Sequence, residues 1–265
     1  MTATTLETAL SPQNLSILFQ PFVRADGEGC SYFAFEGLTR GPRGTNMEKA
    51  PVLFEYARRK GQESALDAAC VGRIFQEAEG LPPGSTISVN VHASTLSRDH
   101  GFVSLLQRVA EGHSWPLNRV IVEVIEHGAP WSTGTFHYEL DALRELGARI
   151  AVDDVGMGDS NIKMLVDCRP DLLKIDRYFT HGCSNDRCRK AVVGALIHIG
   201  AGCGAEVLAE GVETFEDIEV LMTLGVRLFQ GFAFSRPAPA SQFRGPDLVS
   251  GSSIRESGVV AWNNA

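Results

Sequence analysis

The strongest constraint on the fold is an alternation of short apolar runs with amphipathic segments along most of the chain. The apolar runs have the length of strands and are rich in Val, Ile, Leu and Phe. They occupy residues 17–23, 32–38, 86–91, 120–126, 149–154, 172–176, 206–211 and 227–232. Amphipathic, helix-like segments lie among them at residues 64–79, 102–112, 136–147, 189–200 and 215–225. Strands that alternate with helices predict a mainly parallel sheet.

Eight such strands within ~250 residues favour an α/β fold, a single-domain (β/α)8 TIM-like barrel. A doubly wound open sheet is the alternative. We expect residues 1–15 to form an N-terminal lead-in, residues 16–240 the barrel domain, and residues 241–265 a Gly- and Ser-rich C-terminal tail.

Composition narrows the class of protein. The formal charge of −8 argues against binding to nucleic-acid polymers. The sequence contains no apolar run of the ~20 residues that a membrane span needs, and its N-terminus does not resemble a signal peptide. The six cysteines form no C-x-x-C pair, so buried or incidental thiols are expected instead of a disulfide framework or zinc site. These features predict a cytoplasmic protein without membrane contact.

Most of the predicted strands carry a polar residue at or near the C-terminal end. The residues are Glu36, Asn90, Glu123, Asp153 with Asp154, Lys174, Glu210 and Gln230. A barrel brings the C-terminal strand ends to one rim, where active sites of this fold lie. A strand-end residue that meets solvent would explain one or two of them. It does not explain the whole set, because charges in apolar strands carry a desolvation cost.

Carboxylate and amide oxygens are hard ligands that suit Mg²⁺ or Mn²⁺. The adjacent Asp153 and Asp154 can serve two metals if Asp153 bridges them and Asp154 binds the second. Two metals can clamp the attacking and leaving oxygens of a phosphoester. Gly156 and Gly158 then let the following loop lie close to the site. An isolated Asp-Asp pair would be read as a solvated turn.

Seven ordered motifs resemble the EAL domain family, whose members hydrolyse cyclic di-GMP to 5′-pGpG. They are FEGLTR (35–40), SVNVH (88–92), VEVIE (122–126), VDDVGMG (152–158), LLKID (172–176), LAEGVE (208–213) and FQGF (229–232). The resemblance spans about residues 16–240. It implies an EAL-type barrel with one antiparallel strand, two Mg²⁺ or Mn²⁺ ions per active site, and a homodimer.

The resemblance also implies roles for individual residues. The first metal is expected on Glu36, Asn90, Glu123 and Asp153, and the second on Asp153 and Asp154. Lys174 and Glu210 are expected to orient and activate the attacking water between the metals, with Glu210 as the general-base candidate. The residues expected to contact or support the dinucleotide are Gln20, Leu38, Arg40, Glu213 and Gln230. Glu126 is expected to anchor the loop that follows Asp154.

The sequence departs from the family pattern in three motifs. Gly37 replaces the family's Ala in E-A-L, which keeps that position small. Val155, Met157 and Asp159 alter the D-D-F-G-T-G-Y loop, and Ile125 replaces the Thr of E-x-T-E. The predicted metal ligands are retained, while the loop that follows Asp154 differs from the family pattern.

Three functions are therefore weighed. The favoured one is a metal-dependent, cyclic-guanylate-specific phosphodiesterase. The second is a catalytically weak or inactive EAL domain that acts as a cyclic di-GMP receptor or docks on a regulatory protein partner. The third is an enolase-type barrel enzyme in which Mg²⁺ on strand-end carboxylates stabilises an enediolate. The adjacent aspartates and the Asn ligand fit the third less well.

Overall fold

The structure is a computed structural model that describes residues 11–26, 29–98, 101–126, 133–157, 161–243 and 248–249. Within these residues the strands are β1 (Ser16–Asp26), β2 (Gly29–Arg40), β3 (Ile87–His92), β4 (Val120–Ile125), β5 (Arg149–Val155), β6 (Leu172–Ile175), β7 (Glu206–Ala209), β8 (Leu228–Phe229) and β9 (Leu248–Val249). The eight predicted strands are therefore confirmed.

The α-helices of the described residues are α2 (Ala50–Arg59), α3 (Glu63–Ala78), α4 (Ala93–Arg98), α5 (Phe102–Gly112), α6 (Thr133–Glu145), α7 (Asn161–Cys168), α8 (Arg177–Thr180), α9 (Arg187–Cys203) and α10 (Phe215–Leu224). Short 3₁₀ segments are η1 (Pro12–Asn14), η2 (Asn46–Glu48), η3 (Leu117–Arg119), η4 (Cys183–Asn185) and η5 (Ala240–Gln242). The five predicted helices are confirmed as α3, α5, α6, α9 and α10.

The strands form one sheet in the order β1-β8-β7-β6-β5-β4-β3-β2-β9, and β1 also pairs with β2. This pairing closes the sheet into a TIM-like barrel. β3 and β4 are parallel, and so are β5, β6, β7 and β8 along the chain. β1 runs antiparallel to β8, which confirms the predicted antiparallel strand. In the predicted tail, β9 pairs with Cys30 and Ser31 of β2.

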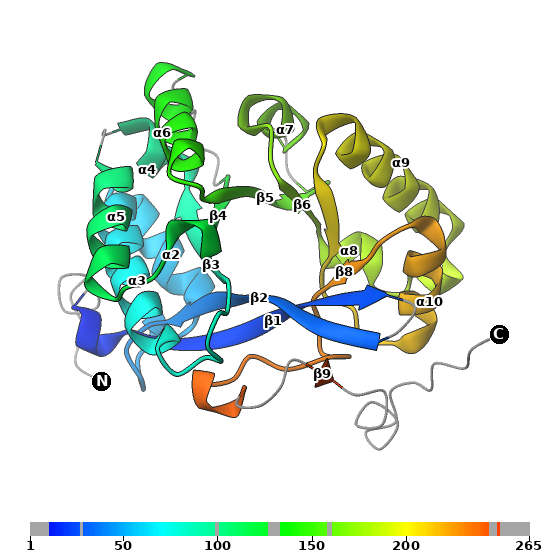
Figure 1. The fold of residues 1–265 in the computed structure, drawn as a ribbon, viewed down its shortest axis with the longest axis horizontal. Coiled ribbons are helices and arrows are strands. Elements are labelled where there is room, and N and C mark those ends of the chain that lie inside the picture. The colour runs from blue at the N-terminus through cyan, green and yellow to red at the C-terminus, as the bar shows by residue number, and fades with distance from the viewer. Residues whose placement is uncertain are drawn as a thin grey trace. The chain divides into compact units, whose positions relative to one another are not determined.

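The chain divides into two compact units. Unit 1 comprises Met1–Phe19, Gly37–Arg149 and Ala238–Arg244, and unit 2 comprises Gln20–Glu36, Ile150–Pro237 and Gly245–Ala265. In unit 1, α3 packs against β3 and α5, and α4 packs against α6 (Figure 1). In unit 2, α9 packs against β6, β7 and α10 (Figure 1).

Local sequence explains where the helices of unit 2 begin and end. The Asp186 side chain accepts hydrogen bonds from the N–H groups of Cys188 and Arg189 at the start of α9. The α9 helix ends at Gly204, which adopts a left-handed conformation. In α10 the Thr214 side chain accepts a hydrogen bond from the N–H of Asp217 at the start, and left-handed Gly225 ends the helix.

No helix in the described part of the chain is both long and apolar enough to cross a bilayer.

Candidate functional site

The adjacent aspartates lie at an irregularity in β5. Val152 pairs with Leu173 and Val155 with Ile175, so β5 advances three residues while β6 advances two. This extra residue is a β-bulge, a feature that redirects side chains beside active sites. Asp154 has φ of +50°, a left-handed conformation that Asp tolerates better than most residues. In a regular strand, consecutive side chains point to opposite faces of the sheet. The bulge lets the consecutive carboxylates of Asp153 and Asp154 contribute to the same site.

In unit 2 a buried lysine connects the acidic residues. Nζ of Lys174 lies 2.9 Å from Oδ1 of Asp153, 2.6 Å from Oε1 of Glu210 and 3.8 Å from Oε2 of Glu36. Lys174 is 1% exposed, and its Nζ also lies 5.4 Å from the ring centroid of Phe22. The lysine therefore offsets part of the negative charge that four carboxylates bring to this cluster.

Two acids of this cluster, Asp154 and Glu210, have raised pKa values. Burial and the neighbouring Asp153 carboxylate raise the pKa of Asp154 to about 7, against the opposing effect of Lys174. Burial and Asp153 also raise the pKa of Glu210 well above its ordinary value. Carboxylates that resist ionisation in this way favour a divalent cation among them.

The oxygen atoms of this cluster fit a metal ion. One carboxylate oxygen each from Asp153, Asp154 and Glu210 lies within 4.8 Å of the other two. Carboxylate oxygens are the donors that Mg²⁺, Mn²⁺ and Ca²⁺ prefer. Asp153 and Asp154 were predicted as ligands, whereas Glu210 was assigned to the attacking water.

Glu36 and two of the predicted nucleotide-contacting residues are held by hydrogen bonds in unit 2. Nε2 of Gln230 donates to Oε2 of Glu36 at 2.7 Å. Nε2 of Gln20 donates to the carbonyl of Ser235 at 3.0 Å. Gln230 thus holds the Glu36 carboxylate, and its role toward the dinucleotide stays a prediction.

Two residues around the cluster, Asp176 and Phe179, were not predicted from the sequence. Asp176 contributes to the raised pKa of Asp154, and its side chain caps α8 by accepting from the N–H of Tyr178 at 2.8 Å. Phe179 covers Gly156, where an added Cβ would collide with its ring. Asp176 lies two residues after Lys174, so the LLKID motif contained the signal for it.

Glu213 forms an ion pair in unit 2. Its Oε1 lies 2.8 Å from Nη2 of Arg177, and both side chains are partly exposed. The predicted contact of Glu213 with the dinucleotide stays a prediction, and the structure adds Arg177 as its partner.

The other predicted residues lie in unit 1. Asn90 and Glu123 are partners in the parallel register of β3 and β4, and Glu123 is fully buried. Leu38 and Arg40, in β2, are half-buried, and Nη1 of Arg40 donates to the carbonyl of Thr39 at 3.0 Å. All four residues lie in the C-terminal halves of their strands.

The predicted loop anchor, Glu126, lies in unit 1. Glu126 follows β4, and its Oε2 is buried without a hydrogen-bond partner among the described residues. Gly158 and Asp159, in the altered loop after Asp154, lie outside the described residues.

The small residue at position 37 has a packing reason. A Cβ at Gly37 would lie 2.7 to 2.8 Å from three side-chain atoms of Ile74. Ile74 is buried on α3 and fills the space that a methyl group at position 37 would occupy. Gly at position 37, where the family has Ala, therefore leaves room for the Ile74 side chain.

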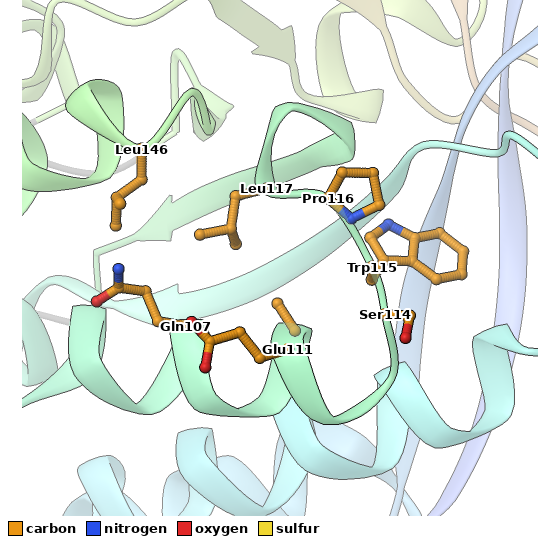
Figure 2. A pocket seen from close by; sticks show the side chains of 8 residues that line it. Gln107, Glu111, Ser114, Trp115, Pro116, Leu117 and Leu146 are labelled. Atoms are coloured by element: carbon orange, nitrogen blue, oxygen red, sulfur yellow. The ribbon is translucent and has the colours of Figure 1, made fainter.

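A pocket of unit 1 contains none of the predicted residues. It has a volume of about 550 Å³ and lies between α5 and the segment before β4, with Gln107 and Glu111 facing Leu117 and Leu146 (Figure 2). Its walls carry no cluster of carboxylates. The acidic cluster of unit 2, and not this pocket, has the chemistry of a metal site.

Fold and site together define a TIM-like barrel protein with an acidic, lysine-containing cluster at the ends of its strands. The sequence model of the EAL domain family matches residues 3–237 of this chain. The chain belongs to the EAL domain family.

Relatives and solved structures share this domain. The cyclic di-GMP phosphodiesterase TpdA of Vibrio parahaemolyticus is 32% identical over 148 residues, which are 56% of this chain and 25% of that protein. The calcium and cyclic di-GMP complex of Klebsiella pneumoniae BlrP1 is similar with a TM-score of 0.74 and 27% identity, covering 90% of this chain and 58% of that one. The cyclic di-GMP complex of the PaMucR phosphodiesterase is similar with a TM-score of 0.76 and 28% identity. The match covers 89% of this chain and 97% of that one.

The length of the match also matters. The chain spans about three tenths of the length of the first curated relatives it matches.

Proposed function

We propose that the chain is a divalent-metal-dependent phosphodiesterase that hydrolyses cyclic di-GMP to 5′-pGpG. The observation that carries this proposal is the carboxylate cluster of Asp153, Asp154 and Glu210 at the β5 bulge, with Lys174 inside it. Cyclic di-GMP complexes of similar EAL structures, one of them with calcium, support the choice of ligand and of a divalent cation.

Each residue of the cluster has a role in this proposal. Asp153 and Asp154 hold the cations, with Mg²⁺ or Mn²⁺ as the physiological candidates and two ions per site. Glu36, Asn90 and Glu123 are proposed as further ligands of the first ion, on the strength of the resemblance. Bound divalent cations would neutralise phosphodiester charge and acidify water at the site.

Lys174 and Glu210 complete the chemistry. Their contact of 2.6 Å keeps a proton donor beside the candidate base. The raised pKa of Glu210 suits a residue that accepts a proton from water and later gives it up. On the substrate side we propose Gln20, Leu38, Arg40, Glu213 and Gln230, with a phosphate as the natural partner of the Arg40 guanidinium.

The test is a turnover assay on purified protein with cyclic di-GMP, with Mn²⁺, with Mg²⁺ and with a chelator, in which chromatography separates pGpG. Asp153→Asn should abolish turnover and leave the melting temperature near that of the wild type. Asp141→Asn, a change to an exposed surface acid on α6, is the matched control. Binding of cyclic di-GMP without formation of pGpG would instead identify a receptor.

We also propose a homodimer formed through α7. Ile162 and Val166 lie one helical turn apart and are 55% and 68% exposed, and Met157 just before this helix is 44% exposed. Exposed apolar residues grouped on one helix suit a partner surface. Light scattering across a dilution series should show dimers, and Val166→Asp should shift them to monomers. A wild-type protein that is monomeric at every concentration would refute the dimer.

A further inference from the structure

Thr180 is a buried polar residue that the predicted site does not include. It is the last residue of α8, it is 0% exposed, and its hydroxyl donates a hydrogen bond to the backbone carbonyl of Glu210. A second carbonyl, that of Arg177, lies 3.4 Å from the same hydroxyl. A hydroxyl has one proton to donate, and the carbonyl of Glu210 is the closer acceptor.

The Thr180 hydrogen bond is one of two that restrain the backbone at Glu210. The N–H of Glu210 donates to the carbonyl of Ile175, at the end of β6, at 3.1 Å. The next residue, Gly211, has φ of +60°, and the side chain of Arg177 covers it so closely that a Cβ there would collide. The peptide groups on both sides of Glu210 are therefore held, and with them the direction in which its side chain leaves the chain.

The carboxylate at the end of that side chain must meet narrow geometric demands. It lies 2.6 Å from Lys174, and one of its oxygens groups with those of Asp153 and Asp154. Cation ligands and catalytic bases lose much of their effect when they are displaced by about 1 Å.

The helix that carries Thr180 is held by other bonds. Asp176 caps its start at the N–H of Tyr178. Just after it, the Asp217 side chain accepts from the N–H groups of Gly182 and Ser184 at 2.8 and 2.9 Å. Removal of the Thr180 hydroxyl should therefore leave α8 in place and release the carbonyl of Glu210 alone.

We propose that Thr180 is a positioning residue that sets the direction of Glu210 toward the cation cluster through the Glu210 carbonyl. Its expected effect on turnover rests on the proposed phosphodiesterase function. Its expected effect on cation affinity does not.

The experiment compares Thr180→Val, which keeps the branched shape and removes the hydroxyl, with Thr180→Ser, which keeps the hydroxyl. Thr180→Ala removes the hydroxyl without any demand for space. Thr223→Val is the matched control, because Thr223 also donates to a backbone carbonyl, that of Glu219 at 2.9 Å, on an exposed part of α10. Each protein is examined for Mn²⁺ affinity by calorimetry, for kcat and KM with cyclic di-GMP, and for melting temperature.

For Thr180→Val and Thr180→Ala we expect Mn²⁺ to bind about three- to tenfold more weakly, as the loss of one hydrogen bond allows. At saturating Mn²⁺ their kcat should fall by about tenfold or more, with KM within about twofold of wild type. Thr180→Ser and Thr223→Val should match the wild type in Mn²⁺ affinity.

Unchanged Mn²⁺ affinity in both hydroxyl-lacking variants would overturn the proposal, and so would equal losses in Thr180→Ser. Unfolding of both hydroxyl-lacking variants would also overturn it, because Thr180 would then be structural. If the wild type does not hydrolyse cyclic di-GMP but the Mn²⁺ shift follows the hydroxyl, the positioning role stands and the phosphodiesterase proposal fails. If the wild type is active and the Mn²⁺ shift is absent, the phosphodiesterase proposal stands and the positioning role fails.

Discussion

Lys174 and Glu210 form a buried ion pair, with 2.6 Å between Nζ and Oε1. The lysine comes from β6, and the glutamate directly follows β7. Because Nζ also lies 2.9 Å from Oδ1 of Asp153 in β5, one ammonium group on β6 joins carboxylates from the ends of the two strands beside it. This arrangement makes the lysine a partner of the metal-binding acids as well as of the candidate base.

Replacement of this lysine should therefore affect both catalysis and the metal-free fold. Lys174→Met keeps the length of the side chain and removes its charge. We expect kcat for cyclic di-GMP to fall by about 100-fold or more, because stabilising charge at the reacting centre is lost. The melting temperature in chelator should also fall, since buried carboxylates lose their counter-ion, and Mn²⁺ should restore part of it. Lys60→Met, at an exposed position after α2, is the control, and equal behaviour of the two variants would contradict the prediction.

Metal binding should depend on pH because of Asp154. In the metal-free protein its pKa is raised to about 7, so this carboxyl holds a proton below that pH. A cation that binds there must displace the proton. Apparent Mn²⁺ affinity should therefore rise as pH increases toward about 7 and level off above it.

Calorimetry in buffers of different ionisation enthalpy measures this proton release. We expect release at pH 6 and little at pH 8, and Asp154→Asn should bind weakly at both. A Mn²⁺ affinity that is constant from pH 5.5 to 8 would show that Asp154 is not a ligand.

The packing of Gly37 against Ile74 predicts a non-additive pair of mutations. Gly37→Ala should destabilise the fold by about 1–3 kcal/mol, because the new methyl group meets a buried, branched side chain. Ile74→Ala should also destabilise, by about 2–5 kcal/mol, through the cavity it leaves. The double variant should be more stable than the sum of the two losses predicts. Denaturant unfolding measures all three, and strict additivity would show that the two side chains do not compete for space.

A buried carboxylate of unit 1 predicts a large loss of stability away from the acidic cluster. Asp67 is 1% exposed and accepts three hydrogen bonds, from the backbone and ring of His92 at 3.0 and 2.8 Å and from Thr95 at 2.5 Å. Asp67→Ala should cost about 3–5 kcal/mol, because buried polar groups lose their partner. Asp141→Ala, on the surface of α6, should change the free energy of unfolding by less than about 0.5 kcal/mol. Similar losses in the two variants would refute the assignment.

The fold could be predicted because its signals repeat along the chain. The apolar runs that became β1 to β8 and the longer amphipathic helices have periodicities that a single sequence displays. Helices α4, α7 and α8 contain 6, 8 and 4 residues, too few for a helical period to stand out. The existence of α2 was also missed, although Pro51 at its start is typical of a first helical turn.

The site could be predicted only as residue types. Strand-end position and the family motifs indicated Lys174 and its acidic neighbours, and the structure brings several of them together in unit 2. The supporting contacts could not be predicted, because they depend on the backbone. The Thr180 hydroxyl reaches a carbonyl 30 residues away, and nothing in its neighbourhood along the chain indicates that acceptor. Asp176 was closer to prediction, since it ends the same motif as Lys174.

The bulge in β5 makes the number of residues in that strand as important as their identity. Val152 and Val155 are anchored to neighbours on β6 that lie two positions apart, so the aspartates between them occupy a space that a regular ladder would fill with one residue. Deletion of a single residue there would restore a regular ladder and could leave one aspartate in place, yet the paired carboxylates would be gone. A relative can therefore retain nearly every motif of this domain and still lose the cation site through one codon, and alignments of this segment are best judged by its spacing before its letters.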